Sequence, residues 1–508
     1  MMALLQQCWQ RQPLLITFCA SLLLSALAVL TGNLNRDGML YVEAANAFLA
    51  DGFAAQHAVF SWPFLSTLMA LLAQVSGLSP EVCGQLLNAL LMAVACVLLI
   101  DLVRRSDPGL TGWAVLVLLA LPGVNEYRNE LIREYGAWCF SLLALRLALD
   151  WPAAPGWPRA VLIQTSVALA VLFRPETAVF LFAILAWQHW QPSSRSRLQR
   201  AILLGALPLL LLLALLIIHA LGLLGEDTRL AFEVGRFDFA RFDHTAAEMS
   251  KTFSHYAREA GTAPLILALG SLALIPWMLP GKLGVFIVPL GCFLASGEVL
   301  AALRRHALLL SALLCHLAVL AVFVLQLHFL SGRYLGLLLL FATPFIALGL
   351  RRLFVVRLRW WKPMLGLLML VALSNVLSLA PSKQHFAHAG AWLAAQHERE
   401  APRVFVGSAR TAHHAGWAYH SRAGALDRAR LEAEIAAGRY DQLVLDVSRK
   451  DKEFPAWLAA HGLHEIQRFS DRKGDAVVVV EPLPAAGELQ RPAAASPASS
   501  DSATRGSE

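Results

Sequence analysis

The sequence contains few charged residues and few cysteines. Only 15% of its 508 residues are charged, whereas 57% are hydrophobic, a balance too apolar for an ordinary soluble enzyme. All seven cysteines lie within or beside apolar stretches, and none follows Cys315. The sequence therefore offers no disulfide framework and no CxxC metal pattern, and thiol chemistry is not expected.

The motifs of several enzyme classes are also missing. The sequence has no Walker A motif, no GxGxxG after a strand and no GxSxG elbow, which disfavours nucleotide hydrolysis and serine hydrolase chemistry. His413, His414 and His420 lack a metal-ligand spacing such as HExxH and are expected to be surface histidines. Without a dense carboxylate cluster, the sequence predicts neither a metal nor another cofactor.

Long apolar runs dominate the rest of the chain and predict an all-α polytopic membrane domain over residues 1–381. Several runs are shorter than the roughly 20 residues that a perpendicular span needs, so we expect about 11–13 transmembrane helices, some tilted or broken. The first run follows Arg11 without a clear cleavage site and is expected to be a retained helix. The runs fall near 14–31, 81–103, 111–122, 136–150, 159–173, 176–190, 201–223, 264–279, 284–302, 307–327, 335–350 and 364–380.

The net charge is +7, and the excess basic residues lie in short clusters between apolar runs, such as Arg104-Arg105. This pattern is typical of cytoplasmic loops that follow the positive-inside rule, so no nucleic-acid partner is expected. Two long polar connections, 33–80 and 224–263, then fall on the opposite side. Twelve spans would return residue 381 to the cytoplasm, whereas the basic loop 351–362 and one further span place it on the opposite side. One segment between 264 and 327 is therefore not expected to cross.

The first long connection contains two amphipathic stretches, Gly38 to Ala50 and Phe60 to Val75. Both have helical periodicity and are expected to lie in the membrane interface. We place the active site on this side of the membrane.

The composition changes after residue 381 to that of a small soluble α/β domain, 382–482. Three apolar stretches predict buried strands, and two amphipathic stretches predict helices between them. The strands are expected at Val404–Val406, Gln442–Val447 and Ala476–Val480, and the helices at Leu431–Ala437 and Pro455–Gly462. The segment 483–508 is rich in Ala, Pro and Ser and is expected to be a disordered tail.

A charged cluster follows the first apolar run directly, and it contains Arg36, Asp37 and Tyr41. A carboxylate at the centre of a spanning helix costs about 2.5–3.5 kcal/mol, so one beside a span needs a polar site or the interface. On a helix that begins at Gly38, Tyr41 lies about one turn beyond Asp37, and both side chains can face one cavity. Alternatively, Asp37 serves as the N-cap of that helix.

A second polar cluster, Asn125 to Tyr135, separates the third and fourth apolar runs on the same side as Asp37. It contains more charge than a short turn requires, with Glu130 and Glu134 as candidate acids and Arg128 and Arg133 as candidate substrate-binding residues. The alternative is an exposed helix on which Glu130 and Glu134 share one face.

Two further arginines, Arg174 and Arg333, divide pairs of apolar runs, and Tyr334 follows the second. All three are candidate substrate-binding residues. Arginines at span ends often extend only to the lipid headgroups. The other interpretation is binding of a lipid-linked phosphate, to which a guanidinium offers two parallel donors. The connection 224–263 could close over a substrate, although a solvated loop has the same composition.

These residues resemble the first external loop and later elements of GT-C membrane glycosyltransferases, in the bacterial branch of protein O-mannosyltransferases and lipid A aminoarabinose transferases. The resemblance covers roughly residues 10–380 through short motifs, so their order carries more weight than any single one. The motifs are Arg36-Asp37-Gly38 with Tyr41, Ala44-Ala45, Ala50-Asp51-Gly52, Ser61-Trp62-Pro63-Phe64, Gly77-Leu78-Ser79-Pro80, Leu172-Phe173-Arg174-Pro175-Glu176-Thr177 and Gly332-Arg333-Tyr334-Leu335, followed by Pro344.

The resemblance implies transfer of a sugar from a polyprenyl-phosphate donor to a glycolipid, lipopolysaccharide or protein acceptor, on the periplasmic face of the bacterial inner membrane. Asp37 matches the acidic position of the family's first loop, and Glu126, Glu130 and Glu134 are available for its second acid. Two departures weaken the case for aminoarabinose transfer. The lysine that this branch has near the Pro63 position is absent here, and Asp37 is followed by Gly38 instead of a second acid.

The chemistry of such a transfer suggests a role for each group. A carboxylate must take or orient the acceptor hydroxyl proton, and cations must stabilise the departing phosphate. We assign Asp37 as general base, and Tyr41 and Glu134 as residues that position sugar or acceptor. The candidate phosphate ligands are Arg36, Arg174 and Arg333.

Two other functions fit part of the sequence. A transporter or flippase of lipid-linked saccharides would also use arginines near a membrane cavity, but it would be expected to show symmetry between halves, and no internal repeat is evident. An assembly protein that docks through residues 382–482 would explain that domain, but not the two acidic clusters.

Overall fold

The computed structural model describes residues 12–31, 33–192, 196–220, 239–259, 261–356, 361–377, 384–397, 403–419 and 428–483. The chain divides into two compact units, Met1–Ser382 and Lys383–Glu508. The predicted tail, apart from residue 483, lies outside the described residues, as does the whole of 221–238, which includes the first part of the predicted connection 224–263.

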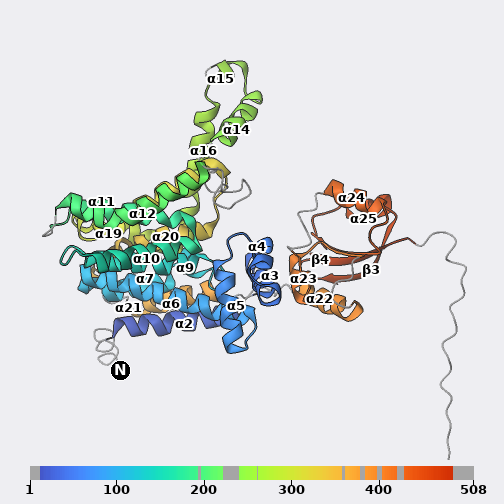
Figure 1. The fold of residues 1–508 in the computed structure, drawn as a ribbon, viewed down its shortest axis with the longest axis horizontal. Helices are drawn as coiled ribbons and strands as arrows, with labels where there is room; N and C mark the ends of the chain where they lie inside the picture. Colours follow the sequence, from blue (N-terminus) through green and yellow to red (C-terminus); the bar gives the residue numbers. More distant parts are fainter. Residues whose placement is uncertain are drawn as a thin grey trace, which may run out of the picture. The chain divides into compact units, whose positions relative to one another are not determined.

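The first unit is helical throughout its described part (Figure 1). Its N-terminal half comprises α2 (Pro13–Thr31), α3 (Arg36–Asp51), α4 (Phe53–Val59), α5 (Phe64–Ser76), α6 (Pro80–Ser106), η1 (Pro108–Leu110), α7 (Thr111–Ala120), α8 (Pro122–Asn125), α9 (Glu134–Leu149), α10 (Trp157–Phe173), η2 (Pro175–Ala178), α11 (Val179–His189) and α12 (Arg197–Ala220). Its C-terminal half comprises α14 (Ala240–Lys251), α15 (His255–Glu259), α16 (Ala263–Leu283), η3 (Gly284–Phe286), α17 (Ile287–Leu294), α18 (Val299–Arg305), α19 (Ala307–Leu327), η4 (Gly332–Tyr334), α20 (Leu335–Val356) and α21 (Trp361–Val376).

The chain is a multi-pass membrane protein. Among the described residues, five helical stretches are long and apolar enough to cross a bilayer: Pro13–Thr31, Pro80–Ser106, Ala263–Leu294, Ala307–Leu327 and Gly332–Phe354. The total of 11–13 spans stays a prediction.

The predicted run 284–302 is not one helix. It is divided into η3, the eight-residue α17 and the start of the seven-residue α18. At about 1.5 Å per residue, α17 and α18 extend roughly 12 and 10 Å, much less than a hydrocarbon core of about 30 Å. Neither helix can cross alone.

The first polar connection forms three helices where two were predicted. Gly52, with a φ of 81°, ends α3 and precedes α4, and Pro63 precedes α5. A positive φ favours glycine because it has no Cβ. The N-cap position of α3 is held by Asn35, and Asp37 lies inside the first turn, so the prediction that Asp37 caps this helix is wrong.

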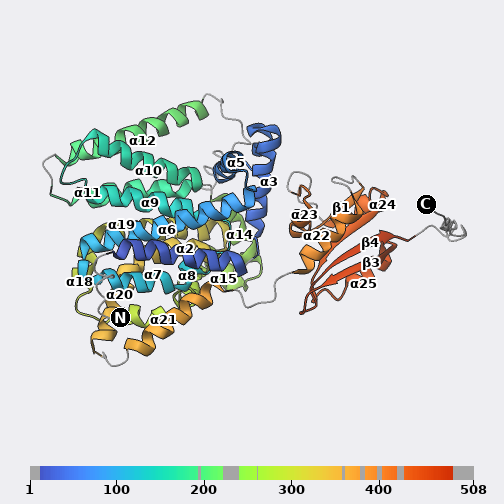
Figure 2. The same ribbon diagram turned by 90° about the horizontal axis from the view of Figure 1, so that it is seen from below.

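Helix α3 lies at one end of the apolar helices α6, α9 and α10 in both views (Figures 1 and 2). Small residues let these apolar helices approach closely. A Cβ at Gly136 of α9 would collide with the ring of Phe173 at the end of α10. The start of α9 and the end of α10 are therefore held together beside α3.

The second unit contains the predicted α/β sheet. Strands β1 (Val404–Val406), β2 (Gln442–Val447), β3 (Leu463–Ser470) and β4 (Ala476–Pro482) form a sheet in the order β1-β2-β4-β3, in which only β1 and β2 are parallel. The helices are α22 (Gln384–Gln396), α23 (Ala409–Ala415), α24 (Arg428–Ala436) and α25 (Phe454–Ala460).

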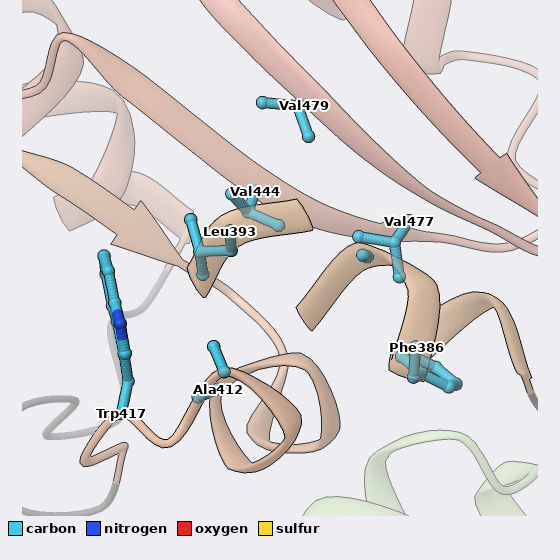
Figure 3. Close-up of a cluster of buried hydrophobic side chains, with 9 residues drawn as sticks. Phe386, Leu393, Ala412, Trp417, Val444, Val477 and Val479 are labelled. Atoms are coloured by element: carbon cyan, nitrogen blue, oxygen red, sulfur yellow. The ribbon is translucent and has the colours of Figure 1, made fainter. Parts of the chain in front are cut away.

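The two faces of this sheet carry separate cores because side chains alternate along a strand. Val444, Val477 and Val479 pack with Phe386 and Leu393 of α22 on one face (Figure 3). On the other face, residues including Leu443, Val478 and Val480 pack against α24 and α25.

Candidate active site

The centre of the candidate site is an ion cluster around Arg333. Its Nη1 donates to Asp37 Oδ2 at 2.5 Å, and its Nε lies 3.2 Å from Glu134 Oε1. The Asp37 side chain is 36% exposed, whereas that of Glu134 is 6% exposed. One guanidinium therefore joins a solvent-accessible carboxylate to a buried one.

Arg174 approaches the same cluster from another side. Its Nη1 donates to Glu134 Oε1 at 2.8 Å, and its Nε donates to Glu176 Oε1 at 2.7 Å. Glu134 thus accepts contacts from two arginines that are 159 positions apart in the sequence, at 174 and 333. We refer to Asp37, Glu134, Arg174, Glu176 and Arg333 as the acid–arginine cluster.

Helix ends explain where the three carboxylates lie. Asp37 is in the first turn of α3, Glu134 is the first residue of α9, and Glu176 is in the first turn of η2. The N-terminus of a helix carries a partial positive charge and unpaired N–H groups, both of which favour a carboxylate. Three helix N-termini therefore help to hold negative charge in one place.

Tyr334 contacts both arginines of the cluster. Its ring lies 4.8 Å from the Arg174 guanidinium carbon and 5.5 Å from that of Arg333. The backbone of η4 is held in turn by His316 of α19, whose Nε2 donates to the Tyr334 carbonyl at 3.0 Å. This contact fixes the short turn that carries Arg333.

Tyr41 and Arg133 form a second contact between the first connection and the loop before α9. Arg133 Nε donates to the Tyr41 hydroxyl at 3.1 Å, and the Arg133 guanidinium carbon lies 5.1 Å from the centre of the Phe60 ring. Burial raises the pKa of Tyr41, although the charge of Arg133 opposes this. Tyr41 is therefore a neutral hydroxyl at neutral pH.

Residues 126–133 form turns and not a helix, so the interpretation of this segment as an exposed helix is wrong. Tertiary partners satisfy its backbone: Asn35 Oδ1 accepts from the Leu131 N–H at 3.0 Å, and Asn88 donates to the Glu130 carbonyl at 3.4 Å. The first of these bonds ties this loop to the residue that precedes α3.

Glu130 is a half-buried acid in this loop. Burial is the largest cause that raises its pKa to about 7, and the charges of Glu134, Asp37 and Glu126 add to the rise, while Arg333 opposes it. A carboxyl with a pKa near neutrality can exchange a proton near neutral pH.

The Ser61–Phe64 motif fastens the first connection to α10. Trp62 Nε1 donates to the Leu172 carbonyl at 2.7 Å, and the Phe64 ring packs edge-on against Phe173 at 5.1 Å. These contacts lie directly before Arg174 in the chain.

Arg128 makes no hydrogen bond to the acid–arginine cluster among the described residues. It is 3% exposed and donates to Asn125 Oδ1, to the Ser21 carbonyl and to Ser25 Oγ. These contacts make it an anchor between α2 and the end of α8, which differs from its predicted role in substrate binding. Arg36 lies exposed at the start of α3, and the described residues do not bring it into the acid–arginine cluster.

One cation near the cluster was not predicted from the sequence. Lys282 Nζ contacts Glu126 Oε1 at 2.5 Å and the Tyr127 hydroxyl at 2.7 Å. A single lysine at the end of an otherwise apolar run was the available signal. Within the described ranges, no group of three or more His, Cys, Asp or Glu side chains is placed to hold a metal ion.

No protein-family model matches the sequence, and no curated protein matches it either. Among solved structures, the chain is similar to ArnT from Cupriavidus metallidurans bound to undecaprenyl phosphate, with 13% identity and a TM-score of 0.45 over 92% of this chain and 98% of that chain. It is also similar to the Archaeoglobus fulgidus oligosaccharyltransferase tethered by a disulfide bond to an acceptor peptide with the NVT sequon, with 11% identity and a TM-score of 0.44 over 93% of this chain and 74% of that chain.

Proposed function

We propose that this protein is a membrane glycosyltransferase that moves a sugar from a polyprenyl-phosphate donor to an envelope acceptor, on the periplasmic face of a bacterial inner membrane. The observation that carries the proposal is the position of Arg333 between Asp37 and Glu134. A guanidinium paired with carboxylates can exchange them for the oxygens of a phosphate, because both anions fit its parallel donors.

The proposed reaction follows from this exchange. The donor phosphate binds Arg333, and Asp37 loses its ionic partner. The acceptor oxygen then attacks the anomeric carbon, its proton passes to the Asp37 carboxylate, and the bond from that carbon to the phosphate oxygen breaks with its electron pair on the phosphate. Arg333 and Arg174 stabilise the charge that develops on the leaving phosphate.

The other members of the cluster have supporting roles. Glu134 is buried between both arginines, which suits it to hold them in place and not to react itself. Glu130 is the second candidate acid, close enough for its pKa to respond to the charges of Asp37 and Arg333. Tyr41 and Arg133 are proposed to contact the sugar or the acceptor, and Arg36 to contact a phosphate at the exposed start of α3.

The substitution Asp37→Asn tests the proposal. It removes the base but keeps the size of the side chain, and a general base contributes about 10²–10⁴-fold to a rate. Cells that lack the protein would be complemented with each variant, and their lipopolysaccharide, pili and other envelope glycans compared by mass spectrometry. We expect wild type to restore a glycan that D37N does not.

Asp51→Asn is the matched control, because Asp51 is an exposed carboxylate at the other end of α3. It should complement fully. Full complementation by D37N, at equal protein levels in the membrane, would contradict the role of Asp37.

A further inference from the structure

Lys282 is the only charged residue in α16, a helix of 21 residues. Ionisable side chains in or at the ends of membrane helices are expensive to hold and usually serve a function. The proposed sugar transfer does not use Lys282, and Lys282 is not part of the motifs that resemble GT-C glycosyltransferases.

The ammonium group of Lys282 is enclosed by a defined set of partners. The side chain is 17% exposed, and Nζ contacts Glu126 and the hydroxyl of Tyr127 while lying 5.0 Å from the centre of the Tyr127 ring. These contacts hold the first two residues of the loop 126–133 to the end of α16.

Lys282 also lies directly against the turn that carries Arg333. A Cβ built on Gly332 would collide with Cε and Nζ of Lys282 and with the Tyr127 hydroxyl. Glycine at position 332 therefore leaves the space that Lys282 and Tyr127 occupy, one residue before Arg333.

The same loop contains Glu130 and leads to Glu134. The Glu130 N–H donates to the Tyr127 carbonyl at 2.9 Å, and the loop ends at Glu134, where α9 begins. Lys282 thus lies where three segments meet: the end of α16, the loop with Glu130, and η4 with Arg333.

We propose that Lys282 is a positioning residue that acts through Glu126 and Tyr127 to hold the 126–133 loop, and with it Glu130 and Glu134, against Arg333. This inference rests on the proposed sugar transfer. Without Lys282, Glu126 loses its cation and the loop is no longer fixed to η4, so the acids shift relative to Arg333 although each remains present.

Lys282→Met tests the inference in a transfer assay with purified protein. A misplacement of about 1 Å can cost about 10²-fold in rate, so kcat should fall by about that factor while the KM for the lipid-linked donor stays within about 2-fold. Lys282→Arg, which keeps the charge, should recover part of the loss. Glu126→Gln combined with K282M should lose no more than K282M alone, because both changes break one contact.

Lys251→Met is the control, because Lys251 also pairs with a glutamate, Glu248, but on the exposed surface of α14. It should leave kcat and KM unchanged. A result for K282M equal to that for K251M would overturn the inference. A raised KM with an unchanged kcat would do so as well, since it would make Lys282 a direct ligand of the donor.

Failure of the proposed function gives a different result. If D37N keeps full transfer activity, the reaction assignment fails whatever Lys282 does. Thermal unfolding of wild type, K282M, E126Q and the double variant in detergent then measures the Lys282–Glu126 contact without any transfer assay. Additive changes in Tm would overturn the contact on which the positioning depends.

Discussion

Helix α9 carries an ion cluster at each end, and the two clusters are built differently. At its start, Glu134 contacts Arg174 and Arg333; near its other end, Arg146 contacts Asp101 and Asp150. The helix has 16 residues, which at about 1.5 Å each separates its ends by roughly 24 Å.

The cluster at the far end is local. Asp101 accepts from Arg104 and Arg105 on its own helix, three and four residues away, and from Arg146 on the neighbouring α9. Arg104 and Arg105 are each 42% exposed. The pairs that these two exposed arginines form within their own helix contribute little individually.

The acid–arginine cluster, in contrast, joins four segments that are distant in the sequence. The Arg333 side chain is 21% exposed and that of Arg174 is 13% exposed. Exposure does not separate the two clusters, because Arg146 in the far cluster is also only 15% exposed. Charges interact more strongly where water is partly excluded. The comparison shows that convergence of distant segments, and not the number of ion pairs, distinguishes the candidate site.

The largest expected difference between the two clusters is in activity. Arg333→Gln should lower sugar transfer by about 10²–10³-fold, the usual effect of removing one group that stabilises developing charge. Arg146→Gln, the same change at the other end of α9, should leave transfer within a few-fold of wild type. A transfer assay on both variants measures this, and similar losses would remove the distinction between the clusters.

Glu130→Gln tests the proton chemistry of the site through pH. If ionised Glu130 assists transfer, the wild-type rate should rise as pH increases through about 7, where this acid titrates. The E130Q variant should be slower and should lack that rise. A rate profile with the same pH dependence in both proteins would contradict a role for Glu130.

The pH dependence of stability tests the raised pKa of Glu130 independently of activity. Because the pKa of Glu130 is raised from 4.5 to about 7 on folding, the folded protein binds more protons between these values, and wild type loses stability as pH increases across this range. E130Q lacks this effect, so its Tm relative to wild type should increase from pH 4.5 to about 7. A constant difference in Tm would show that the pKa is not raised.

Arg128→Met should separate a structural arginine from a functional one. Arg128 is buried, and its removal leaves Asn125, Ser21 and Ser25 without their donor. Each hydrogen bond from a charged group contributes about 1.5–3 kcal/mol, so the Tm in detergent should fall clearly. Activity per folded molecule should stay near that of wild type, whereas a loss like that of R333Q would return Arg128 to the site.

Arg105→Gln should have the smallest effect. Its side chain is 42% exposed and forms ion pairs with Asp101 at 3.0 Å and Asp150 at 3.3 Å. Such pairs contribute about 0.2–1 kcal/mol, so both Tm and transfer should change little. Thermal unfolding at low and high salt checks this, and a large salt-independent loss would show that the far cluster is not merely local.

The small domain shows how far local patterns could predict this fold. Strands β1 and β2 occur at the predicted positions and β4 extends two residues further, because each is a short run of apolar or β-branched residues. Strand β3 was missed because most of its residues are exposed and a register shift between Glu465 and Gln467 interrupts its alternation. An edge strand with a bulge does not show a period of two.

The loop 126–133 shows where local patterns failed to predict the fold. Its charges permit helical pairs, but Leu131 and Ile132 are buried and its backbone groups bond to Asn35 and Asn88. These partners come from distant segments, which no local period can reveal.

The sequence by itself determined the membrane class, the small C-terminal α/β unit and a short list of charged residues beside apolar runs, because hydrophobicity and charge are properties of each segment. The tertiary structure alone decided which charges meet. It placed Arg333 between Asp37 and Glu134, assigned Arg128 to an anchor among α2 and α8, and brought Lys282 against Gly332. Those pairings depend on how distant helices pack, and packing is not encoded in the pattern of any one of them.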